Sequence, residues 1–366
     1  MREYVDGTTA IVRGALAAGC DFFAGYPITP ASGILMAMMR ELPRSGGVAV
    51  QGEDEIASIG MCIGAAMAGS RAMTATSGPG LSLYSENIGL AVMGEVPLVI
   101  VDVQRMGPST GGATTVSQGD VQFVRWGTAG GYPIIALAPS NVVECYILTA
   151  RAFRLAERFR CPVFVLTDKE TAMTLTTVDL DAYPAVGMVS RPVATSGAPY
   201  RYTPRDAVAP LRILGSGDPV RFTGSTHDEH AVITKDAPTV ASLNRHLTAK
   251  IDEHIDEIES VRSDLDPDAD TLVVGYGVTA GAVEQAVATA RRTGNPLSSL
   301  IIQSLWPLPE KTIARALNGV KRVIVPELNI GLYRREIERL ARDQEVIGVN
   351  RIDGELITAA SILEKA

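Results

Sequence analysis

The sequence contains few of the residues that usually bind metals, with four histidines and four cysteines among 366 residues. Cys20, Cys62, Cys145 and Cys161 form no C-x-x-C pair, which argues against an iron–sulfur or zinc site on this chain. Their apolar neighbours predict buried, reduced thiols, and no nearby histidine favours a catalytic cysteine. The segment 227–230, His-Asp-Glu-His, could suggest a metal site, but no further obvious ligands accompany it. We interpret that segment as structural.

Long apolar runs are also missing. The stretch Ile88–Val103 comes closest to the length that spans a membrane, and Glu95 and Pro97 interrupt it. The first residues lack the apolar core of a signal peptide. We therefore expect a cytoplasmic protein without a membrane partner.

The charge and composition narrow the class of protein further. A net charge of −8 at pH 7 argues against nucleic acid as the main partner. The hydrophobic fraction of 46% and the charged fraction of 20% are ordinary for a soluble globular protein. A chain of 366 residues is long enough for two domains.

Short apolar runs alternate with longer helix-like segments in the first half of the chain. This alternation predicts crossover units and a mostly parallel sheet, which is an α/β fold. The strands are expected at Cys20–Gly25, Val48–Gln51, Ala72–Thr76, Pro97–Val103, Ile134–Ala138 and Val163–Thr167. The helices are expected at Ala31–Leu42, Glu53–Ala68, Leu81–Met93 and Asn141–Phe159.

The second half begins with a segment that lacks this rhythm. Residues 185–268 are expected to form an irregular connection followed by a linker helix at Thr239–Val261, whose apolar residues fall on one face. Residues 269–366 form a second α/β unit, and residues 1–184 the first. Strands of the second unit are expected at Thr271–Gly275, Ser298–Gln303, Arg322–Pro326 and Val346–Asn350. Its helices are expected at Gly281–Arg292, Glu310–Asn318, Leu332–Asp343 and Glu355–Lys365.

A stiff turn after the first of these strands defines the candidate site. Residues 25–30, Gly-Tyr-Pro-Ile-Thr-Pro, contain a glycine and two prolines, which stop regular structure. The turn fixes the hydroxyl of Thr29 at the carboxyl end of the strand. In open α/β sheets ligands bind at that edge.

Three more motifs follow strands that end at the same edge. They are Glu53-Asp54-Glu55, the segment 76–80 (Thr-Ser-Gly-Pro-Gly), and Arg105 with the Gly-rich loop after it. Each has a plain structural interpretation, because acidic residues favour helix starts and proline suits the first turn of a helix. A lone arginine after a strand is usually a surface residue. Arginine is nevertheless suited to bidentate carboxylate binding, and the following glycines allow close approach of a ligand.

These motifs resemble those of the α subunits of 2-oxoacid:ferredoxin oxidoreductases, which are thiamine-diphosphate enzymes, and most of all those acting on 2-oxoglutarate. The resemblance covers nearly the whole chain. It is carried by Tyr26–Pro30, Gly52–Ser58, Thr76–Gly80, Gln104–Gly111, Gln118–Asp120 and Pro326–Gly331. It implies a pyrimidine-binding domain at residues 1–184 and a transketolase C-terminal-like domain at residues 269–366.

The resemblance implies roles for residues around the cofactor. One glutamate, Glu55 rather than Glu53, touches the aminopyrimidine ring and so activates the thiazolium carbon. The spacing of Glu55 to the small residues of its helix favours it over Glu53. Pro27, Thr29 and Ser77 are the other expected cofactor contacts.

The resemblance also assigns the substrate carboxylate. Thr29 and Arg105 are expected to bind it, with Ser109 and Thr110 as weaker candidates. The implied reaction is the oxidative decarboxylation of 2-oxoglutarate with coenzyme A to succinyl-CoA, CO2 and reduced ferredoxin. The same chemistry on pyruvate, branched-chain or aryl 2-oxoacids stays open, as does a non-catalytic interaction subunit.

One family motif is absent from the sequence. The Gly-Asp-Gly segment with downstream asparagines, which in the family holds magnesium and the diphosphate, does not occur. We therefore expect a β subunit to provide magnesium, the diphosphate contacts and a [4Fe-4S] cluster. Ferredoxin is the expected electron acceptor, and γ and δ subunits are further candidate partners; the family's γ domain is not recognised in the sequence.

A glycine-rich turn offers one competing interpretation. Gly275-x-Gly277-x-x-x-Gly281 follows an expected strand, as a nicotinamide-dinucleotide loop would. The next strand ends at residues 301–303, Ile-Ile-Gln, without the expected acidic residue. A plain strand–helix turn is the better interpretation.

Overall fold

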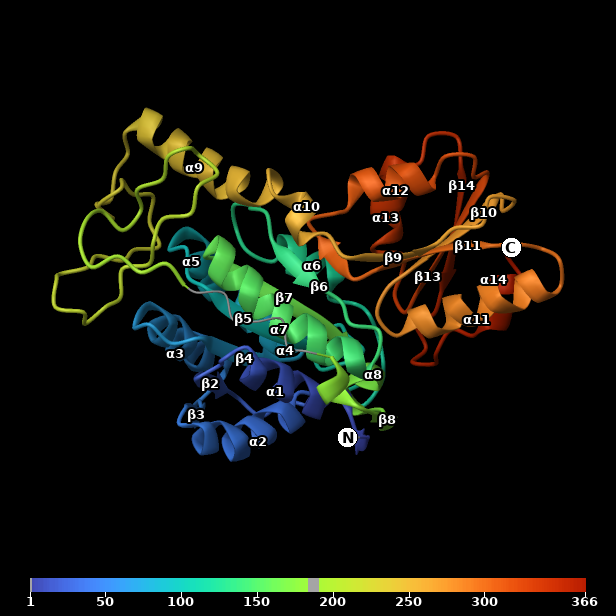
Figure 1. The fold of residues 1–366 in the computed structure, drawn as a ribbon, viewed down its shortest axis with the longest axis horizontal. Helices are drawn as coiled ribbons and strands as arrows, with labels where there is room; N and C mark the ends of the chain where they lie inside the picture. The colour runs from blue at the N-terminus through green and yellow to red at the C-terminus, as the bar shows by residue number, and fades with distance from the viewer. Residues whose placement is uncertain (1, 184–190) are drawn as a thin grey trace.

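A computed structural model describes residues 2–183 and 191–366, which form two large sheets covered by helices and one small two-stranded sheet (Figure 1). The expected end of the first domain at residue 184 lies outside the described residues. The expected α/β fold with two mostly parallel sheets is confirmed. In Figure 1 the first domain runs from blue to green, and the second, in orange and red, lies beside it.

The first sheet has seven strands in the order β12-β6-β7-β5-β4-β2-β3. Six are parallel: β2 (Phe22–Gly25), β3 (Val48–Gln51), β4 (Ala72–Thr76), β5 (Leu98–Gln104), β6 (Ile135–Leu137) and β7 (Pro162–Asp168). Every residue of β4, β5 and β7 is buried, which is typical of strands covered on both faces. These strands therefore form the rigid centre from which the site loops leave.

Helices cover both faces of this sheet. One face carries α1 (Gly7–Ala17), α2 (Ser32–Glu41) with the 3₁₀ turn η1 (Leu42–Ser45), and α7 (Val142–Phe159). The other carries α3 (Glu55–Met67), α4 (Gly78–Leu83), α5 (Ser85–Met93) and α6 (Val121–Trp126). Asp6, Asp54 and Asn141 accept backbone hydrogen bonds at the starts of α1, α3 and α7, so local capping fixes where these helices begin.

The second sheet has the order β14-β13-β10-β11-β9. Its strands are β9 (Val261–Asp264), β10 (Thr271–Gly275), β11 (Ser298–Ile302), β13 (Arg322–Glu327) and β14 (Glu345–Asn350). The helices α11 (Thr279–Arg292) and α14 (Ala359–Leu363) pack on one face, and α12 (Glu310–Ala316) and α13 (Arg334–Leu340) on the other. One apolar cluster continues from the α3–α5 face of the first sheet to the α12–α13 face of the second. The two domains thus share part of their core.

Several expected elements differ in the structure. The helix predicted at Thr239–Val261 is present as α9 (Ala237–Asp252), but its predicted continuation to Val261 is wrong. A separate short helix, α10 (Ile255–Ile258), follows, and the chain then enters β9. Acidic residues gathered at the negative end of α9 disfavour its continuation. The predicted helix at Leu81–Met93 is two helices, α4 and α5, and the one at Glu355–Lys365 shortens to α14 because Thr358 caps it.

Some elements had no counterpart in the sequence pattern. β12 (Ser304–Trp306) leaves the second domain and pairs antiparallel with β6 at the edge of the first sheet. β1 (Glu3–Val5) and β8 (Thr176–Val178) form a separate antiparallel pair. The short helix α8 (Lys169–Met173) and the 3₁₀ turn η2 (Leu180–Ala182) complete the chain. Three-residue strands carry too little periodicity to be recognised in a sequence.

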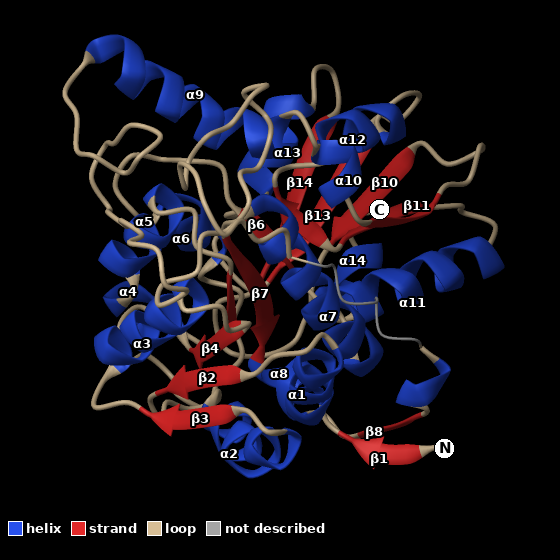
Figure 2. Ribbon diagram, turned by 60° about the vertical axis from the view of Figure 1, so that its left-hand side comes forward, coloured by secondary structure: helices blue, strands red, loops and turns tan. Residues whose placement is uncertain are grey.

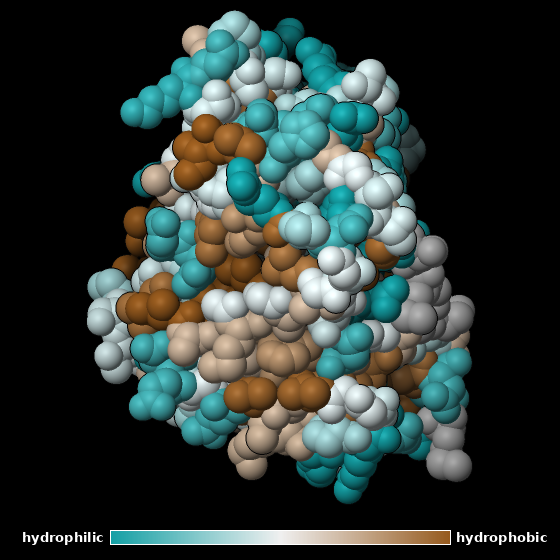
Figure 3. All heavy atoms as spheres, turned by 90° about the vertical axis from the view of Figure 1, so that its left-hand side faces the viewer, coloured by the Kyte–Doolittle hydropathy of each residue, from teal (hydrophilic) through white to brown (hydrophobic). Residues whose placement is uncertain are grey.

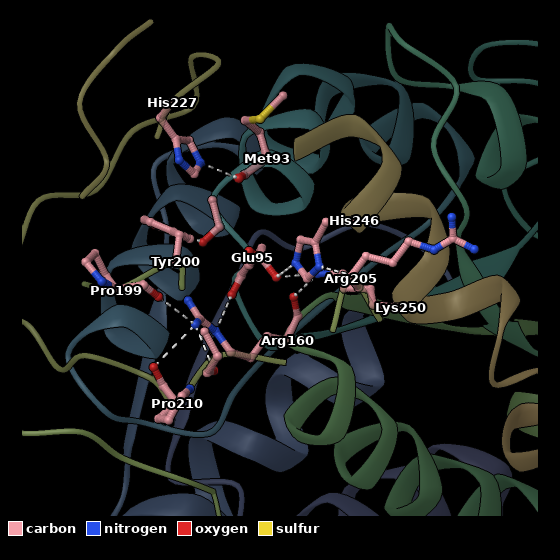
Figure 4. Close-up of polar contacts among 12 residues, drawn as sticks. Met93, Glu95, Arg160, Pro199, Tyr200, Arg205, Pro210, His227, His246 and Lys250 are labelled. Atoms are coloured by element: carbon pink, nitrogen blue, oxygen red, sulfur yellow. Dashed lines mark hydrogen bonds and ion pairs between the residues drawn. The ribbon is translucent and has the colours of Figure 1, made fainter. Parts of the chain in front are cut away.

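A buried polar cluster fastens the connecting segment and α9 to the first domain (Figure 4). Oε2 of Glu95 accepts hydrogen bonds from Lys250 (2.9 Å to Nζ) and faces Nε2 of His246 at 3.0 Å. Arg160 donates from Nη1 to the carbonyl oxygen of Ala209 in the connecting segment at 3.0 Å. Nε of Arg160 also donates to the backbone carbonyl oxygen of Glu95 at 3.2 Å. Lys250, His246 and Arg160 are all at most 3% exposed, so these contacts form out of water. This cluster fixes the connecting segment although it has little regular structure.

Candidate active site

The candidate site lies where β2, β4 and β5 end. These strands are parallel, so their carboxyl ends meet at one edge, and Figure 2 shows β2, β3 and β4 pointing in the same direction. The turn at residues 26–30 leaves β2, Ser77 follows β4, and Arg105 follows β5. The structure therefore brings the sequence motifs together at the edge where they were expected.

Arg105 joins two of the site loops. Its Nη1 donates a hydrogen bond to the carbonyl oxygen of Thr29 at 2.6 Å, and its Nη2 to that of Thr110 at 3.1 Å. The side chain is 93% buried, and its Nε has no hydrogen-bond partner in the described chain. Thr29 and Ser109 are exposed beside it, and Ser109 has a left-handed backbone with φ of 54°. Arg105 thus shapes both loops and keeps one buried N–H unused.

The two glutamates of the acidic motif have different surroundings. Asp54 caps α3 by accepting a hydrogen bond from the backbone N–H of Ala57 at 2.7 Å, so the helix begins at Glu55. The predicted helix start at Glu53 is wrong: Glu53 precedes the cap and is exposed. Glu55 is 8% exposed, and within residues 2–183 and 191–366 its carboxylate takes part in no hydrogen bond or ion pair. A capping aspartate placed between the two glutamates therefore separates their environments.

Gly80 allows the carboxylate of Glu55 to lie against the next loop. A methyl group at Gly80 would collide with Oγ1 of Thr76 and lie 3.0 Å from Oε1 of Glu55. Ser77 is fully buried at the start of α4, but its side chain forms no capping hydrogen bond, and its Oγ has no partner in the described chain. The Ser77 hydroxyl is thus a buried polar group without a partner at the start of the helix whose Gly80 faces Glu55. Unpaired buried groups are rare in proteins and call for a ligand or another explanation.

A cavity of about 590 Å³ opens next to these residues, between the two domains. The first domain lines it with α4, Arg105 and the loop that follows. The second domain contributes the turns after β13 and β14, including Asn329 and Arg351. Glu55 and Thr29 do not line this cavity. Arg105 and Ser109 line it, and Arg105 also lies at the sheet edge, so it connects the two.

Two acidic residues at this edge had no role in the sequence prediction. Asp102 is fully buried inside β5, and Asp120 lines the cavity before α6. Burial raises the pKa of Asp102 well above its usual value and that of Asp120 to about 6. The signal available in the sequence was the single charge within the apolar run Leu98–Gln104.

The glycine-rich turn after β10 is a packed domain junction. Gln118 of the first domain donates from Nε2 to the carbonyl oxygen of Tyr276 at 3.0 Å and accepts from the backbone N–H of Leu328 at 3.1 Å. A methyl group at Gly277, where φ is 55°, would lie 2.7 Å from Nε2 of Gln118. The side chain of Gln118 thus covers the place where a dinucleotide phosphate would bind. The plain-turn interpretation accounts for these contacts.

The His-Asp-Glu-His segment forms a turn. His227 is buried against Tyr200, with ring centroids 4.3 Å apart, and Asp228 accepts backbone hydrogen bonds from His230 and Val232. Among the described residues no group of three acidic, histidine or cysteine side chains is arranged to hold a metal ion. The four cysteines are free and buried, as expected.

The chain matches known proteins along most of its length. Residues 13–245 match the thiamine-diphosphate-binding part of pyruvate flavodoxin/ferredoxin oxidoreductases, and residues 269–362 match core domain II of pyruvate:ferredoxin oxidoreductase. The 2-oxoglutarate synthase subunit KorA of Methanocaldococcus jannaschii is 42% identical over 97% of this chain and 96% of its own. The ketoisovalerate oxidoreductase subunit VorB of Methanothermobacter thermautotrophicus is 36% identical over 99% and 96%.

Solved structures give the same result. The 2-oxoglutarate:ferredoxin oxidoreductase from Magnetococcus marinus, with 2-oxoglutarate, coenzyme A and succinyl-CoA bound, superposes with a TM-score of 0.93 at 30% identity. That match covers 100% of this chain and 64% of the Magnetococcus chain. A split-gene transketolase has a TM-score of 0.55 at 11% identity, which shows a shared fold.

Proposed function

We propose that this chain, which belongs to the family of pyruvate flavodoxin/ferredoxin oxidoreductases, is the α subunit of a 2-oxoglutarate:ferredoxin oxidoreductase. The reaction would convert 2-oxoglutarate and coenzyme A to succinyl-CoA and CO2 and pass two electrons to ferredoxin. The observation that carries the proposal is the near full-length identity of 42% to a 2-oxoglutarate synthase subunit. The site geometry supports it, because the family's expected residues lie at one sheet edge.

The residues present fit the aminopyrimidine end of thiamine diphosphate. Glu55 is 8% exposed and its carboxylate has no hydrogen-bond or ion-pair partner in the described chain, and Ser77 offers a buried hydroxyl without one. Gly80 leaves room beside them. When bound, the cofactor supplies a nucleophilic carbon that attacks the 2-oxo group and then carries the electrons left after decarboxylation. Glu55 would hold the proton at the pyrimidine ring nitrogen, and Ser77 and Pro27 would position that ring.

The substrate carboxylate would bind beside Arg105. Its two Nη atoms hold the loops that present Thr29 and Thr110, and its buried Nε remains unused. A charge-assisted hydrogen bond from Arg105 together with the exposed hydroxyls of Thr29 and Ser109 would orient a planar carboxylate. We assign Arg105 the larger contribution because it is already fixed in place before the substrate binds.

A partner subunit would complete the site. Since the described chain has no metal-binding cluster, we assign magnesium, the diphosphate contacts and the [4Fe-4S] cluster to a β subunit. The face on the left of Figure 1 carries apolar patches (Figure 3). Tyr26, Ile56 and Leu83 are exposed apolar residues next to the predicted site residues in sequence or on the neighbouring helix. Exposed apolar residues beside a site suit a permanent protein–protein contact.

No helix of the described chain is long and apolar enough to cross a membrane.

A branched-chain 2-oxoacid is the second candidate substrate. It is supported by the 36% identity to the ketoisovalerate oxidoreductase subunit. The test is to co-express the chain with its partner subunits and to measure ferredoxin reduction with coenzyme A and a panel of 2-oxoacids. The proposal requires a kcat/KM for 2-oxoglutarate well above those for pyruvate and 2-oxoisovalerate. A preference for 2-oxoisovalerate would move the chain to the second candidate, and no reduction with any 2-oxoacid would remove the enzymatic function.

A further inference from the structure

The segment 115–118 leads from the loop after β5 toward α6 and is packed into the second domain. Val116 is 4% exposed and lies in an apolar cluster whose other described members all belong to residues 273–366. Gly354, in the turn after β14, lies against Thr115, because a methyl group built on Gly354 would be 2.1 Å from Cγ2 of Thr115. This part of the first domain therefore takes its apolar surroundings from the second.

Hydrogen bonds join the same segment to two turns of the second domain. The backbone N–H of Gln118 and the hydroxyl of Ser117 each donate to the carbonyl oxygen of Leu328 at 3.0 Å. Nδ2 of Asn329 donates to the carbonyl oxygen of Gln118 at 2.7 Å. The fully buried side-chain amide of Gln118 donates to the carbonyl oxygen of Tyr276 at 3.0 Å and accepts from the N–H of Leu328 at 3.1 Å. Gln118 thus joins the first domain to the turns after β10 and β13.

The anchored segment also closes the loop that carries Ser109 and Thr110, which we call the carboxylate loop (residues 106–116). The backbone N–H of Met106 donates to the carbonyl oxygen of Thr115 at 2.9 Å, so the two ends of the loop meet at its base. Farther out, Nη2 of Arg105 donates to the carbonyl oxygen of Thr110 at 3.1 Å. The carboxylate loop is therefore held by Arg105 on one side and, at its base, by the segment that the second domain anchors.

We propose that Gln118 is a positioning residue for the substrate carboxylate, through which the second domain fixes the carboxylate loop beside Arg105. This inference rests on the proposed function, in which Arg105, Thr29 and Ser109 bind that carboxylate. Gln118 is buried at the domain junction and does not line the cavity, so it acts through the loop. The second domain thereby takes part in presenting the groups that bind the substrate.

The anchor matters because ordering a mobile loop costs conformational entropy. A loop that is ordered before the ligand arrives avoids this cost at the binding step. Ser109 also has a left-handed backbone with φ of 54°, which residues other than glycine rarely adopt unless their surroundings hold them. Without the anchor we expect the loop to leave this conformation and the 2-oxoacid to bind more weakly. Glu55 and Ser77 follow other strands of the sheet and should keep their positions.

The experiment compares two glutamines of the junction in the assembled complex. Gln118→Met keeps the approximate size of the side chain but removes both amide hydrogen bonds. Gln122→Met is the matched control, because Gln122 also bonds across the junction, from Nε2 to the carbonyl oxygen of Leu332 at 2.9 Å, but belongs to α6. We expect Gln118→Met to raise KM for the 2-oxoacid about two- to tenfold, which is the net effect of one hydrogen bond. KM for coenzyme A should stay unchanged, and Gln122→Met should change neither KM.

A second measurement does not depend on turnover. The backbone N–H groups of Met106, Gly112 and Thr115 are hydrogen-bonded within the carboxylate loop, so amide hydrogen–deuterium exchange of a peptide covering residues 106–116 reports how firmly the loop is held. Gln118→Met should speed this exchange several-fold, whereas exchange at the thiazolium carbon should keep the wild-type rate. Ser117→Ala removes one anchoring bond and should give the same changes at a smaller size. It replaces Gln118→Met if that variant does not fold.

The outcomes separate this inference from the proposed function. Unchanged loop exchange, or faster loop exchange without a rise in KM for the 2-oxoacid, overturns the inference and leaves the carboxylate site in place. Equal effects of Gln122→Met would show a general loosening of the junction and would also overturn it. An unchanged KM for the 2-oxoacid in Arg105→Ala would instead remove Arg105 from carboxylate binding, and with it that part of the proposed function.

Discussion

The two ends of β5 treat buried charge in opposite ways. Before the strand, the carboxylate of Glu95 is fully buried and bonded to Lys250, with His246 at 3.0 Å. Toward the other end, Nε of Arg105 just after the strand has no hydrogen-bond partner, and neither carboxylate oxygen of Asp102 within the strand has one in the described chain. At the first end, the chain supplies a cation to Oε2 of Glu95, although Oε1 has no hydrogen-bond partner in the described chain. At the end near Arg105, the charged groups keep hydrogen-bonding atoms that no group of the described chain uses, so they are available to a ligand.

The pKa shifts at the two ends show the same contrast. Burial alone would raise the pKa of Glu95, but the charge of Lys250 and the hydrogen bond with His246 hold it well below its usual value. No cation of that kind compensates Asp102, and burial raises its pKa well above the usual value. Paired charges at one end stabilise the fold, whereas unpaired ones at the other cost stability and so indicate function. Four substitutions test this contrast.

The largest effect is expected at Glu55. Glu55→Gln keeps the shape but removes the ionisable group, and hydrogen–deuterium exchange at the thiazolium carbon in the assembled complex should slow by about 10²–10⁴-fold. The exposed Glu53 provides the matched control, since Glu53→Gln should leave the exchange rate near that of the wild type. If the control slows exchange and Glu55→Gln does not, the assignment of the two glutamates is reversed.

Next comes the paired end of β5. Lys250→Met removes the cation from Glu95 but leaves the carboxylate buried, and should lower the free energy of unfolding by about 3–5 kcal/mol. The measurement is urea unfolding of the chain at neutral pH. Lys321→Met, at an exposed ion pair with Asp270, is the control and should change stability by less than about 1 kcal/mol. Equal effects of both variants would show that the buried cluster is not what fastens α9.

A smaller effect is expected at Arg105. Arg105→Ala should raise KM for the 2-oxoacid about tenfold or more, because a hydrogen bond to a charged group contributes roughly 1.5–3 kcal/mol. KM for coenzyme A should change little. Since Arg105 also holds the backbones of Thr29 and Thr110, thermal unfolding of the variant must be recorded beside the kinetics. An equal rise of both KM values would indicate a collapsed loop and not a lost carboxylate contact.

The smallest effect is expected at Ser77. Its hydroxyl is buried without a partner, so Ser77→Ala should leave the midpoint of unfolding unchanged or slightly higher. Thiamine-diphosphate affinity of the complex should nevertheless fall several-fold, by roughly 0.5–1.5 kcal/mol. Thr74→Val is a useful contrast, because Thr74 is hydrogen-bonded to Tyr84 at 2.8 Å and its loss should destabilise the fold. A destabilised Ser77→Ala would show that the hydroxyl serves the fold.

The sequence predicted the parallel core well because its strands are buried on both faces and appear as continuous apolar runs. The strands β4, β5 and β7 lie within one or two residues of the expected ranges. The linker helix failed because apolar spacing alone continued the pattern through residues 253–254, where the structure ends α9 and begins α10. β12 could not be foreseen, since it acquires its partner, β6, from another domain.

The site was predicted in part. Motifs placed Thr29, Glu55, Ser77 and Arg105 at one edge, where the structure also has them. The roles of these residues stay predictions, because the structure shows contacts and burial and not chemistry. Asp120 belongs to a motif that carried the resemblance but received no role, because its packing against α4 is a tertiary contact that leaves no pattern in the local sequence.

Because the second domain contributes β12 to the first sheet, that sheet can be completed only late in the synthesis of the chain. The outer edge of the first sheet is β6, and its partner β12 is made of residues 304–306, well after the rest of that sheet. A ribosome therefore releases most of the first domain with that edge still open, and unpaired edges invite wrong pairing. The first domain reaches its final form only after residues 304–306 of the second have been translated. Cutting the gene in the connecting segment would thus produce a first half that lacks one strand of its own sheet.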